Sequence, residues 1–267
     1  MDRKHFEVLI GRFDNYSHRF IHGSSIPGPL QLKRDHALRV VDEIFSLASE
    51  LALDDDSIHI AGAMALFHDL GRFRQFEKYR TFLDIKSENH ARRSILEIDA
   101  HDMLLGCSAR EKNLIRGAIA VHNAARVPRL KDSRKVFFMK LLRDADKLDI
   151  WRVVIDNYSS PDMQNYEFIN LGLQDLRGCS PKAIEAIEKN RLVMGDSIGE
   201  LNDFKLMQIS WVFDLNFPQT MVKVRERGYV ERLIESLSIS RHDMGLDEIF
   251  KSVFRFMDSE AGKSWLN

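Results

Sequence analysis

A histidine and an aspartate, His68 and Asp69, directly follow the apolar stretch IAGAMALF at residues 60–67. A helix over this stretch has no polar side chain on any face, which is typical of a helix buried on all sides. Both polar side chains are therefore expected in the interior, where a polar group without a partner costs about 2–7 kcal/mol. The fold must bring other polar groups, or a cation, to this pair.

Further residues of the same two chemical kinds lie before and after the pair. They are His36, His90, His122 and Asp146. Imidazole nitrogens and carboxylate oxygens are ligands of borderline and hard cations, whereas thiolate ligands are absent from the set. The sequence therefore predicts a centre for one or two divalent ions, of which Mn, Fe, Ni, Co, Zn and Mg are the candidates.

The predicted helices place these residues where a shared site between helices can form. His36 begins an amphipathic helix, His90 begins another, and His122 ends a third, so each lies at a helix end. The helix predicted over 134–158 is apolar nearly all round and carries Asp144 and Asp146 on different stripes. Helical periodicity alone does not choose between these two carboxylates.

Apolar residues recur with helical period along nearly the whole chain, and no run of alternating β-branched residues is bounded by turn signals. The fold class predicted is all-α. Helices are expected over about 2–21, 34–53, 57–70, 90–105, 110–123, 134–158, 181–194, 200–214, 218–237 and 245–259. Asp35 is expected to cap the second of these helices, and Pro181 to lie in the first turn of the seventh.

The composition and turn residues predict how the chain is organised. The 267 residues can bury a sizeable core. Residues 1–160 are predicted to form the metal-binding helical domain, and residues 161–180, which contain Pro, Gly and other turn formers, a linker. Residues 181–267 are expected to form a C-terminal helical part packed on the core, which shapes access to the site or mediates association into a homo-oligomer.

The order of His36, then His68-Asp69, then Asp146 within the segment DADKLD resembles the HD-domain superfamily of metal-dependent phosphohydrolases. The resemblance covers roughly residues 30–158 and implies an HD-domain helical bundle with a C-terminal helical extension. It also implies that Asp146 is the last metal ligand, with Asp144 as the fallback and Asp149 behind the ligands. His90 and His122 are similar to the two histidines of the subset of this family that holds two metals.

The resemblance implies a division of the ligands between two ions. His36, His68 and Asp146 would hold one ion, His90 and His122 the other, and Asp69 would bridge them and support catalysis by a metal-activated water. The alternative with one ion keeps only the first three ligands and Asp69. Two departures narrow the substrate. The chain has no Gly-Tyr-Pro segment and carries Arg72 in place of a Lys soon after the pair, and it has no Glu-Asp pair shortly after Asp69. Cyclic dinucleotides and alarmones are therefore disfavoured.

The segment 71–89, GRFRQFEKYRTFLDIKSEN, joins the pair to His90 and has an aromatic residue at every third position from Phe73 to Phe82. This spacing predicts a short helical lid that packs its aromatic side chains inward and turns its cations to a phosphate group. Arg72 and Arg80 are the catalytic candidates in this lid, and Lys147 is a third candidate beside Asp146. A solvated charged surface is the alternative interpretation of the lid.

The overall charge limits the partners of the chain, and the cysteines indicate its compartment. With 39 basic and 40 acidic side chains, the chain has no global field for a nucleic acid polymer or an anionic membrane. Two distant cysteines and the lack of a long apolar segment predict a cytoplasmic protein. The expected activity is hydrolysis of a small phosphorylated substrate, such as a nucleotide, by a phosphomonoesterase, nucleotidase or phosphodiesterase. A di-iron oxygenase of the HD type and a metal-bound regulatory module are the alternatives.

Overall fold

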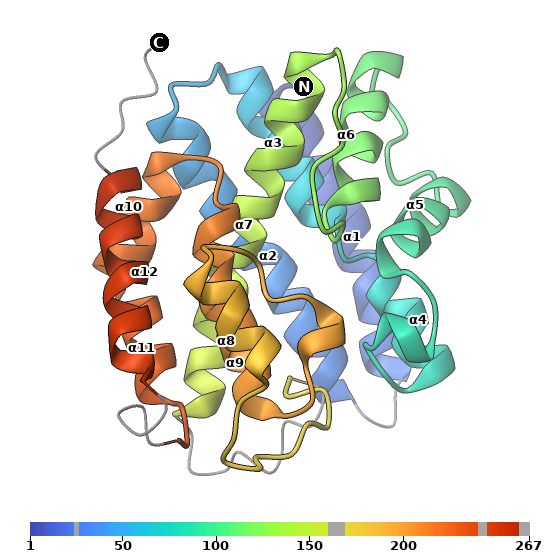
Figure 1. Cartoon of the computed structure of the whole chain (residues 1–267). Coiled ribbons are helices and arrows are strands. Elements are labelled where there is room, and N and C mark those ends of the chain that lie inside the picture. The colour runs from blue at the N-terminus through green and yellow to red at the C-terminus, as the bar shows by residue number, and fades with distance from the viewer. Residues whose placement is uncertain (24–26, 160–168, 240–244, 262–267) are drawn as a thin grey trace. The chain divides into compact units, whose positions relative to one another are not determined.

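The computed structural model describes residues 1–23, 27–159, 169–239 and 245–261. Every regular element in these ranges is a helix, which confirms the predicted all-α fold (Figure 1). The chain divides into two compact units, Met1–Asp149 and Ile150–Asn267. Residues 160–168, which belong partly to the predicted linker, lie outside the described ranges. No described helix is both long and apolar enough to cross a bilayer.

The first unit is built from seven helical segments and one 3-10 turn. They are α1 (Arg3–Gly23), α2 (Pro27–Glu50), α3 (Asp55–Phe67), α4 (Gly71–Tyr79), η1 (Asp84–Lys86), α5 (His90–Ala100), α6 (Ala109–Val121) and the first part of α7 (Ser133–Tyr158). All six predicted ligands belong to this unit.

Helix α3 is the central helix of the first unit. Its residues from Ile60 to Phe67 are all buried, and it packs against α1, α2 and α6 (Figure 1). Asp54 starts the helix, because its carboxylate accepts a hydrogen bond from the backbone N–H of Ser57 at 2.7 Å. The helix ends at Phe67 within the core, so the next two residues emerge in the interior.

A close approach of two helices fixes the turn that follows α3. A Cβ atom on Gly71 would lie 2.5 Å from the backbone nitrogen of Ser94 on α5, so a larger residue does not fit there. The hydroxyl of Ser94 accepts a hydrogen bond from the Gly71 N–H at 2.8 Å and donates one to the carbonyl of His68 at 2.7 Å. Glycine at this position thereby holds the end of α3 against the start of α5.

Several predicted helix boundaries are wrong. Helix α5 ends at Ala100 rather than at 105, and the helix that begins at Pro181 ends at Glu188 rather than at 194. Helix α2 begins at Pro27 rather than at 34, because proline is tolerated in the first turn, where its missing N–H has no intrahelical acceptor. Asp35 therefore lies inside the helix, where it accepts a hydrogen bond from Gln31 at 2.7 Å, and is not a cap. The segment predicted as one helix over 218–237 is interrupted at Gly228, whose φ of +60° is left-handed.

The second unit contains the end of α7 and the remaining helices. These are α8 (Pro181–Glu188), η3 (Gly195–Ser197), α9 (Leu201–Ser210), η4 (Trp211–Asp214), α10 (Pro218–Glu226), α11 (Tyr229–Glu235) and α12 (Leu246–Ala261). Its core forms around the fully buried Trp151, which packs against the rings of Trp211 and Tyr229 and donates to the carbonyl of Gln208. Pro181 lies in the first turn of α8, as predicted.

Candidate metal centre

Five helices or helix ends bring the six predicted residues together. His36 lies within α2, His68 caps the end of α3, and His122 caps the end of α6. His90 is the first residue of α5, and Asp146 lies within α7. The four histidines and Asp69 are buried, and the side chain of Asp146 is 14% exposed.

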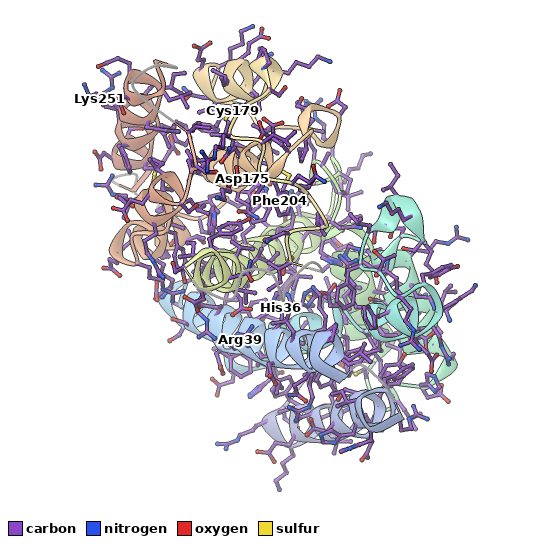
Figure 2. The ribbon with its side chains drawn as sticks, turned by 90° about the horizontal axis from the view of Figure 1, so that it is seen from below. His36, Arg39, Asp175, Cys179, Phe204 and Lys251 are labelled. Carbon is purple, nitrogen blue, oxygen red and sulfur yellow. The ribbon has the colours of Figure 1, made fainter. Side chains whose placement is uncertain are left out.

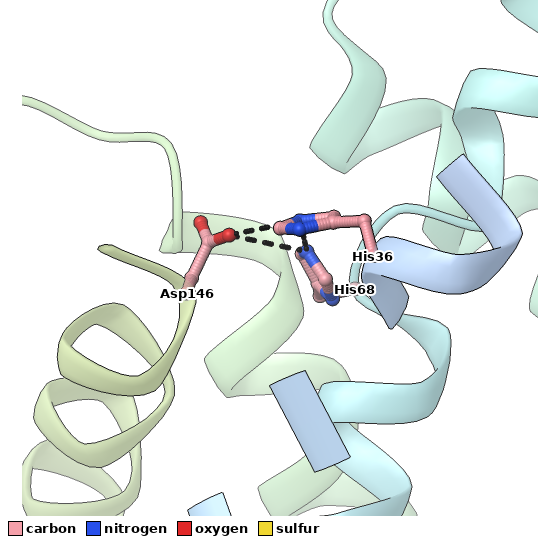
Figure 3. Close-up of side chains that lie close together, drawn as sticks. All are labelled: His36, His68 and Asp146. Carbon is pink, nitrogen blue, oxygen red and sulfur yellow. Dashed lines mark hydrogen bonds and ion pairs between the residues drawn. The ribbon is translucent and has the colours of Figure 1, made fainter. Parts of the chain in front are cut away.

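A first group of possible ligands consists of His36, His68 and Asp146, whose side chains point toward one another (Figure 3). The Nε2 atoms of the two histidines are 3.3 Å apart. Oδ1 of Asp146 lies 3.1 Å from Nε2 of His36 and 3.5 Å from Nε2 of His68. Oδ2 of Asp69 lies 3.8 Å from both nitrogens, so Asp69 is a fourth candidate ligand of this group.

A second group lies on the other side of the Asp69 carboxylate. His68, Asp69 and His122 also offer ligand atoms within 4.8 Å of one another. Nε2 of His90 is 3.0 Å from Nε2 of His122. Oδ1 of Asp69 lies 3.6 Å from Nε2 of His90 and 3.8 Å from Nε2 of His122. Asp69 therefore directs one oxygen to each group.

The Nδ1 atoms of all four histidines face away from this centre and are held by acceptors. His68 donates to the carbonyl of Ala65 at 2.7 Å, and His122 donates to the carbonyl of Ile119 at 2.8 Å. Because a carbonyl oxygen can only accept, the proton of each neutral ring is on Nδ1 and the lone pair is on Nε2. This is the arrangement in which an imidazole can bind a metal through Nε2.

Carboxylates hold the Nδ1 atoms of the other two histidines. His36 donates to Oδ2 of Asp149, and His90 donates to Oδ2 of Asp84, each at 2.7 Å. Asp149 is itself held by Arg39, which lies near His36 on α2 and donates to both carboxylate oxygens at 2.6 and 3.0 Å (Figure 2). Such carboxylates behind metal-binding histidines orient the ring and make Nε2 more basic.

The charges of the centre keep its carboxylates ionised. Burial disfavours the ionised form of Asp69, but Lys33, His68 and Arg72 outweigh the burial and hold its pKa well below the usual range. Burial also opposes ionisation of Asp146, yet its histidine neighbours, His68 first, hold its pKa well below that range. The centre therefore presents two carboxylate anions at neutral pH.

The histidines of the two groups differ in their affinity for a proton. Burial lowers the pKa of His36, but Asp146 and Asp149 outweigh the burial and raise it above the ordinary value of 6.5. Burial lowers the pKa of His122 to about 3, and burial together with the nearby Arg72 lowers the pKa of His90. The second group therefore holds two neutral imidazoles whose Nε2 atoms face each other.

Two buried oxygen atoms in the centre accept no hydrogen bond from any described residue, namely Oδ1 of Asp69 and Oδ1 of Asp146. Buried polar atoms are nearly always satisfied, so such oxygens call for a bound cation. Converging Nε2 lone pairs also repel one another unless a positive species lies between them. The buried His and Asp residues thus form a group that could hold a metal ion, as the sequence predicted.

Two cationic side chains flank the Asp69 carboxylate. Nζ of Lys33 donates to Oδ2 at 2.8 Å, and Nε of Arg72 lies 3.4 Å from Oδ1. Both cations also lie over the ring of Phe82, Lys33 at 5.5 Å and Arg72 at 5.8 Å from its centroid. These two residues place positive charge next to the candidate ligands.

The remaining candidates are placed differently. Phe73, Phe76 and Phe82 are buried, as expected of the lid. Arg80 is exposed over the ring of Phe76, and within the described residues it pairs with none of the six ligand candidates. Lys147 is buried. Of the two basic residues proposed in the lid, Arg72 alone reaches the ligands.

Sequence reasoning missed Lys33 and Arg39, which precede and follow His36 by one helical turn. Residues three apart lie on the same face of a helix, so this spacing was a usable signal. Asp84 precedes His90 by six residues and begins the short 3-10 turn η1, so no helical period could indicate that its carboxylate meets the ring.

No family model, no curated protein and no solved structure matches this chain.

The Asp149 carboxylate provides a test of how His36 is positioned. Replacing it in Asp149→Asn is expected to weaken metal binding about 10- to 100-fold, because the ring loses its anionic partner. Competition of the protein with a chelating dye for Co²⁺ or Zn²⁺ measures the change. Asp99→Asn is the matched control, since Asp99 pairs with Arg116 at the surface. Equal affinity in wild type and Asp149→Asn would contradict the assignment.

The pKa of His36 also determines the direction in which metal affinity changes with pH. Because the folded pKa of His36 is raised above 6.5, protons compete for Nε2 below that raised pKa. Metal affinity is thus expected to be full above it and to fall about tenfold per pH unit below it. In Asp149→Asn the pKa of His36 drops, so the decline should begin at a lower pH.

Proposed function

We propose that this protein is a metal-dependent phosphohydrolase of the HD-domain type that acts on a small phosphorylated substrate. The observation that carries the proposal is the convergence of four imidazole Nε2 atoms and two carboxylates in one buried centre, beside Lys33 and Arg72. Ligands of this kind suit a divalent transition metal, and the adjacent cations suit a phosphate group.

The order of the ligands along the chain supports the HD-domain part of the proposal. His36, the His68-Asp69 pair and Asp146 come from three different helices of one all-helical unit and meet at one point. The pair lies directly after the buried helix α3. His90 and His122 complete the same centre from two further helices.

His36, His68, Asp69 and Asp146 would hold the metal. A bound ion of this kind lowers the pKa of a coordinated water and polarises a phosphoryl oxygen. The residues around the ligands have separate tasks: Asp149 and Ala65 hold the rings of His36 and His68 with Nε2 directed to the centre.

Lys33 and Arg72 would bind the substrate phosphate. The Lys33 side chain is 19% exposed and the Arg72 side chain 14% exposed, so both are largely shielded from water, where their charges act strongly. Both the ammonium of Lys33 and the guanidinium of Arg72 attract a phosphate by their positive charge. Both residues also counter the negative charge of Asp69, which would otherwise repel the substrate.

The reaction is tested with protein purified without chelator and supplied with Mn²⁺, Co²⁺ or Ni²⁺. Under anaerobic conditions, a panel of nucleotides and phosphomonoesters should yield free phosphate or nucleoside. The absence of oxygen separates hydrolysis from the chemistry of a di-iron oxygenase of the HD type. Failure of the whole panel with every metal, together with oxygen consumption by iron-loaded protein, would favour the oxygenase.

Lys33→Ala tests the anion-binding part of the proposal. A contact to the substrate phosphate that is equal in ground and transition states affects KM more than kcat. We expect KM to rise about 10- to 100-fold, because the substrate phosphate loses one hydrogen bond to a charged group. Metal content should not fall, since the variant removes a positive neighbour of Asp69. Lys78→Ala is the control, because Lys78 is exposed beside the ring of Tyr79. A fall in kcat with loss of metal would contradict this role.

A further inference from the structure

The second ligand group contains a positively charged side chain of the protein itself. Nη2 of Arg72 lies 3.3 Å from Nε2 of His90 and forms a hydrogen bond with it. Nε of the same guanidinium lies 3.4 Å from Oδ1 of Asp69. The second group offers Oδ1 of Asp69 and the Nε2 atoms of His90 and His122. Two of these three atoms, those of Asp69 and His90, therefore already face a cation.

The lone pair of His90 can serve only one partner. Its Nδ1 donates to the Asp84 carboxylate at 2.7 Å, so the proton of the neutral ring is on Nδ1 and Nε2 carries a single lone pair. Arginine stays protonated in proteins and can only donate, so the hydrogen bond from Arg72 uses that lone pair. A metal would need the same lone pair, and the two partners exclude each other.

The guanidinium is fixed in this position by other groups. Nη1 of Arg72 donates to Oε1 of Gln75 at 2.9 Å, to the carbonyl of Phe82 at 2.5 Å, and pairs with Oδ1 of Asp84 at 3.1 Å. Gln75 is fully buried and donates to the same Asp84 oxygen at 2.9 Å. Asp84 thereby connects the arginine and the His90 ring in one network.

The first ligand group lacks this obstruction. Lys33 touches only Oδ2 of Asp69, and a carboxylate oxygen has more than one lone pair, so it can accept from Lys33 and still bind an ion. Within the described part of the chain, no Lys or Arg donates to Nε2 of His36 or His68.

We propose that Arg72 takes the place of a second metal ion in this centre. One divalent ion binds tightly through His36, His68, Asp69 and Asp146, and the guanidinium supplies the second positive charge beside His90. The inference rests on the metal centre of the proposed function and selects its one-ion form. It predicts that removal of an arginine increases the number of metal ions bound.

The test is the stoichiometry of Co²⁺ or Mn²⁺ binding, measured by equilibrium dialysis and elemental analysis on the full chain. Wild type is expected to bind one equivalent tightly, and Arg72→Met two, with the second equivalent bound at least tenfold more tightly than in wild type. Arg74→Met is the matched control on the same helix, because Arg74 pairs with Glu77 and Glu97. It should bind one equivalent.

His90→Ala tests the same inference by removing the histidine that Arg72 contacts. In the wild-type background this variant should retain its single ion, and in the Arg72→Met background it should abolish the second one. Two equivalents of similar affinity in wild type would overturn the role of Arg72 and leave the proposed phosphohydrolase intact. A single equivalent in folded Arg72→Met, with a wild-type circular dichroism spectrum, would overturn it as well. Protein that binds no ion in any variant would overturn both proposals.

Discussion

Asp69→Asn is expected to bind metal more than about 100-fold more weakly than wild type, and to lose metal-dependent activity with it. The carboxylate directs one oxygen to each ligand group, and its pKa lies well below the usual range, so it is an anion at neutral pH. Asparagine preserves the shape of the side chain but removes the charge that attracts the ion. The loss should exceed that of Asp149→Asn, since Asp149 acts on the ion only through His36.

Elemental analysis and thermal unfolding separate loss of the ligand from loss of the fold. Removing the anion leaves Lys33 and Arg72 without their buried partner, which destabilises the metal-free protein by about 3–5 kcal/mol at neutral pH. The depressed pKa of Asp69 means that its stabilisation is present above pH 3.8 and is lost as the pH falls through the folded pKa. The difference in stability between wild type and Asp69→Asn should therefore shrink in acid. Asp55→Asn, at an exposed helix start, is the control; folded Asp69→Asn with full metal content would refute the assignment.

The all-α fold could be predicted from the sequence because helical periodicity is a local property. The apolar run before His68 predicted a buried helix, and α3 is that helix. Helix ends were less accessible, because they depend on contacts remote in sequence. Gly71 illustrates this: only the backbone of α5, which would lie 2.5 Å from a Cβ atom at this position, explains why glycine begins α4.

The members of the centre could also be predicted, but their partners could not. Histidine and carboxylate ligands were recognisable by residue type and by order along the chain. The acceptors behind them follow no pattern, since the backbone carbonyls of Ala65 and Ile119 have no residue signature. Arg72 and Arg80 were indistinguishable in the sequence as cations of one lid. The left-handed backbone of Arg80, with a φ of +55°, ends α4 and leaves the side chain over Phe76, whereas Arg72 enters the centre.

The choice between Asp144 and Asp146, which periodicity left open, leads to a second large expected effect. These residues are two positions apart on α7, so their side chains leave the helix in directions about 200° apart and cannot share one site. Oδ1 of Asp146 lies 3.1 Å from Nε2 of His36 and accepts no hydrogen bond from a described residue. Asp144 is fully buried and belongs to neither ligand group.

Asp146→Asn is therefore expected to lose most of its bound metal and its metal-dependent activity. Asp144→Asn should show the opposite pattern: the fold loses about 1–3 kcal/mol, because a buried carboxylate loses its interactions, while the folded fraction keeps its metal. Metal content per folded protein, measured beside urea unfolding, distinguishes the two outcomes. Metal loss in Asp144→Asn with retention in Asp146→Asn would transfer the last ligand to Asp144 and require α7 to be rotated about its axis in the metal-bound protein.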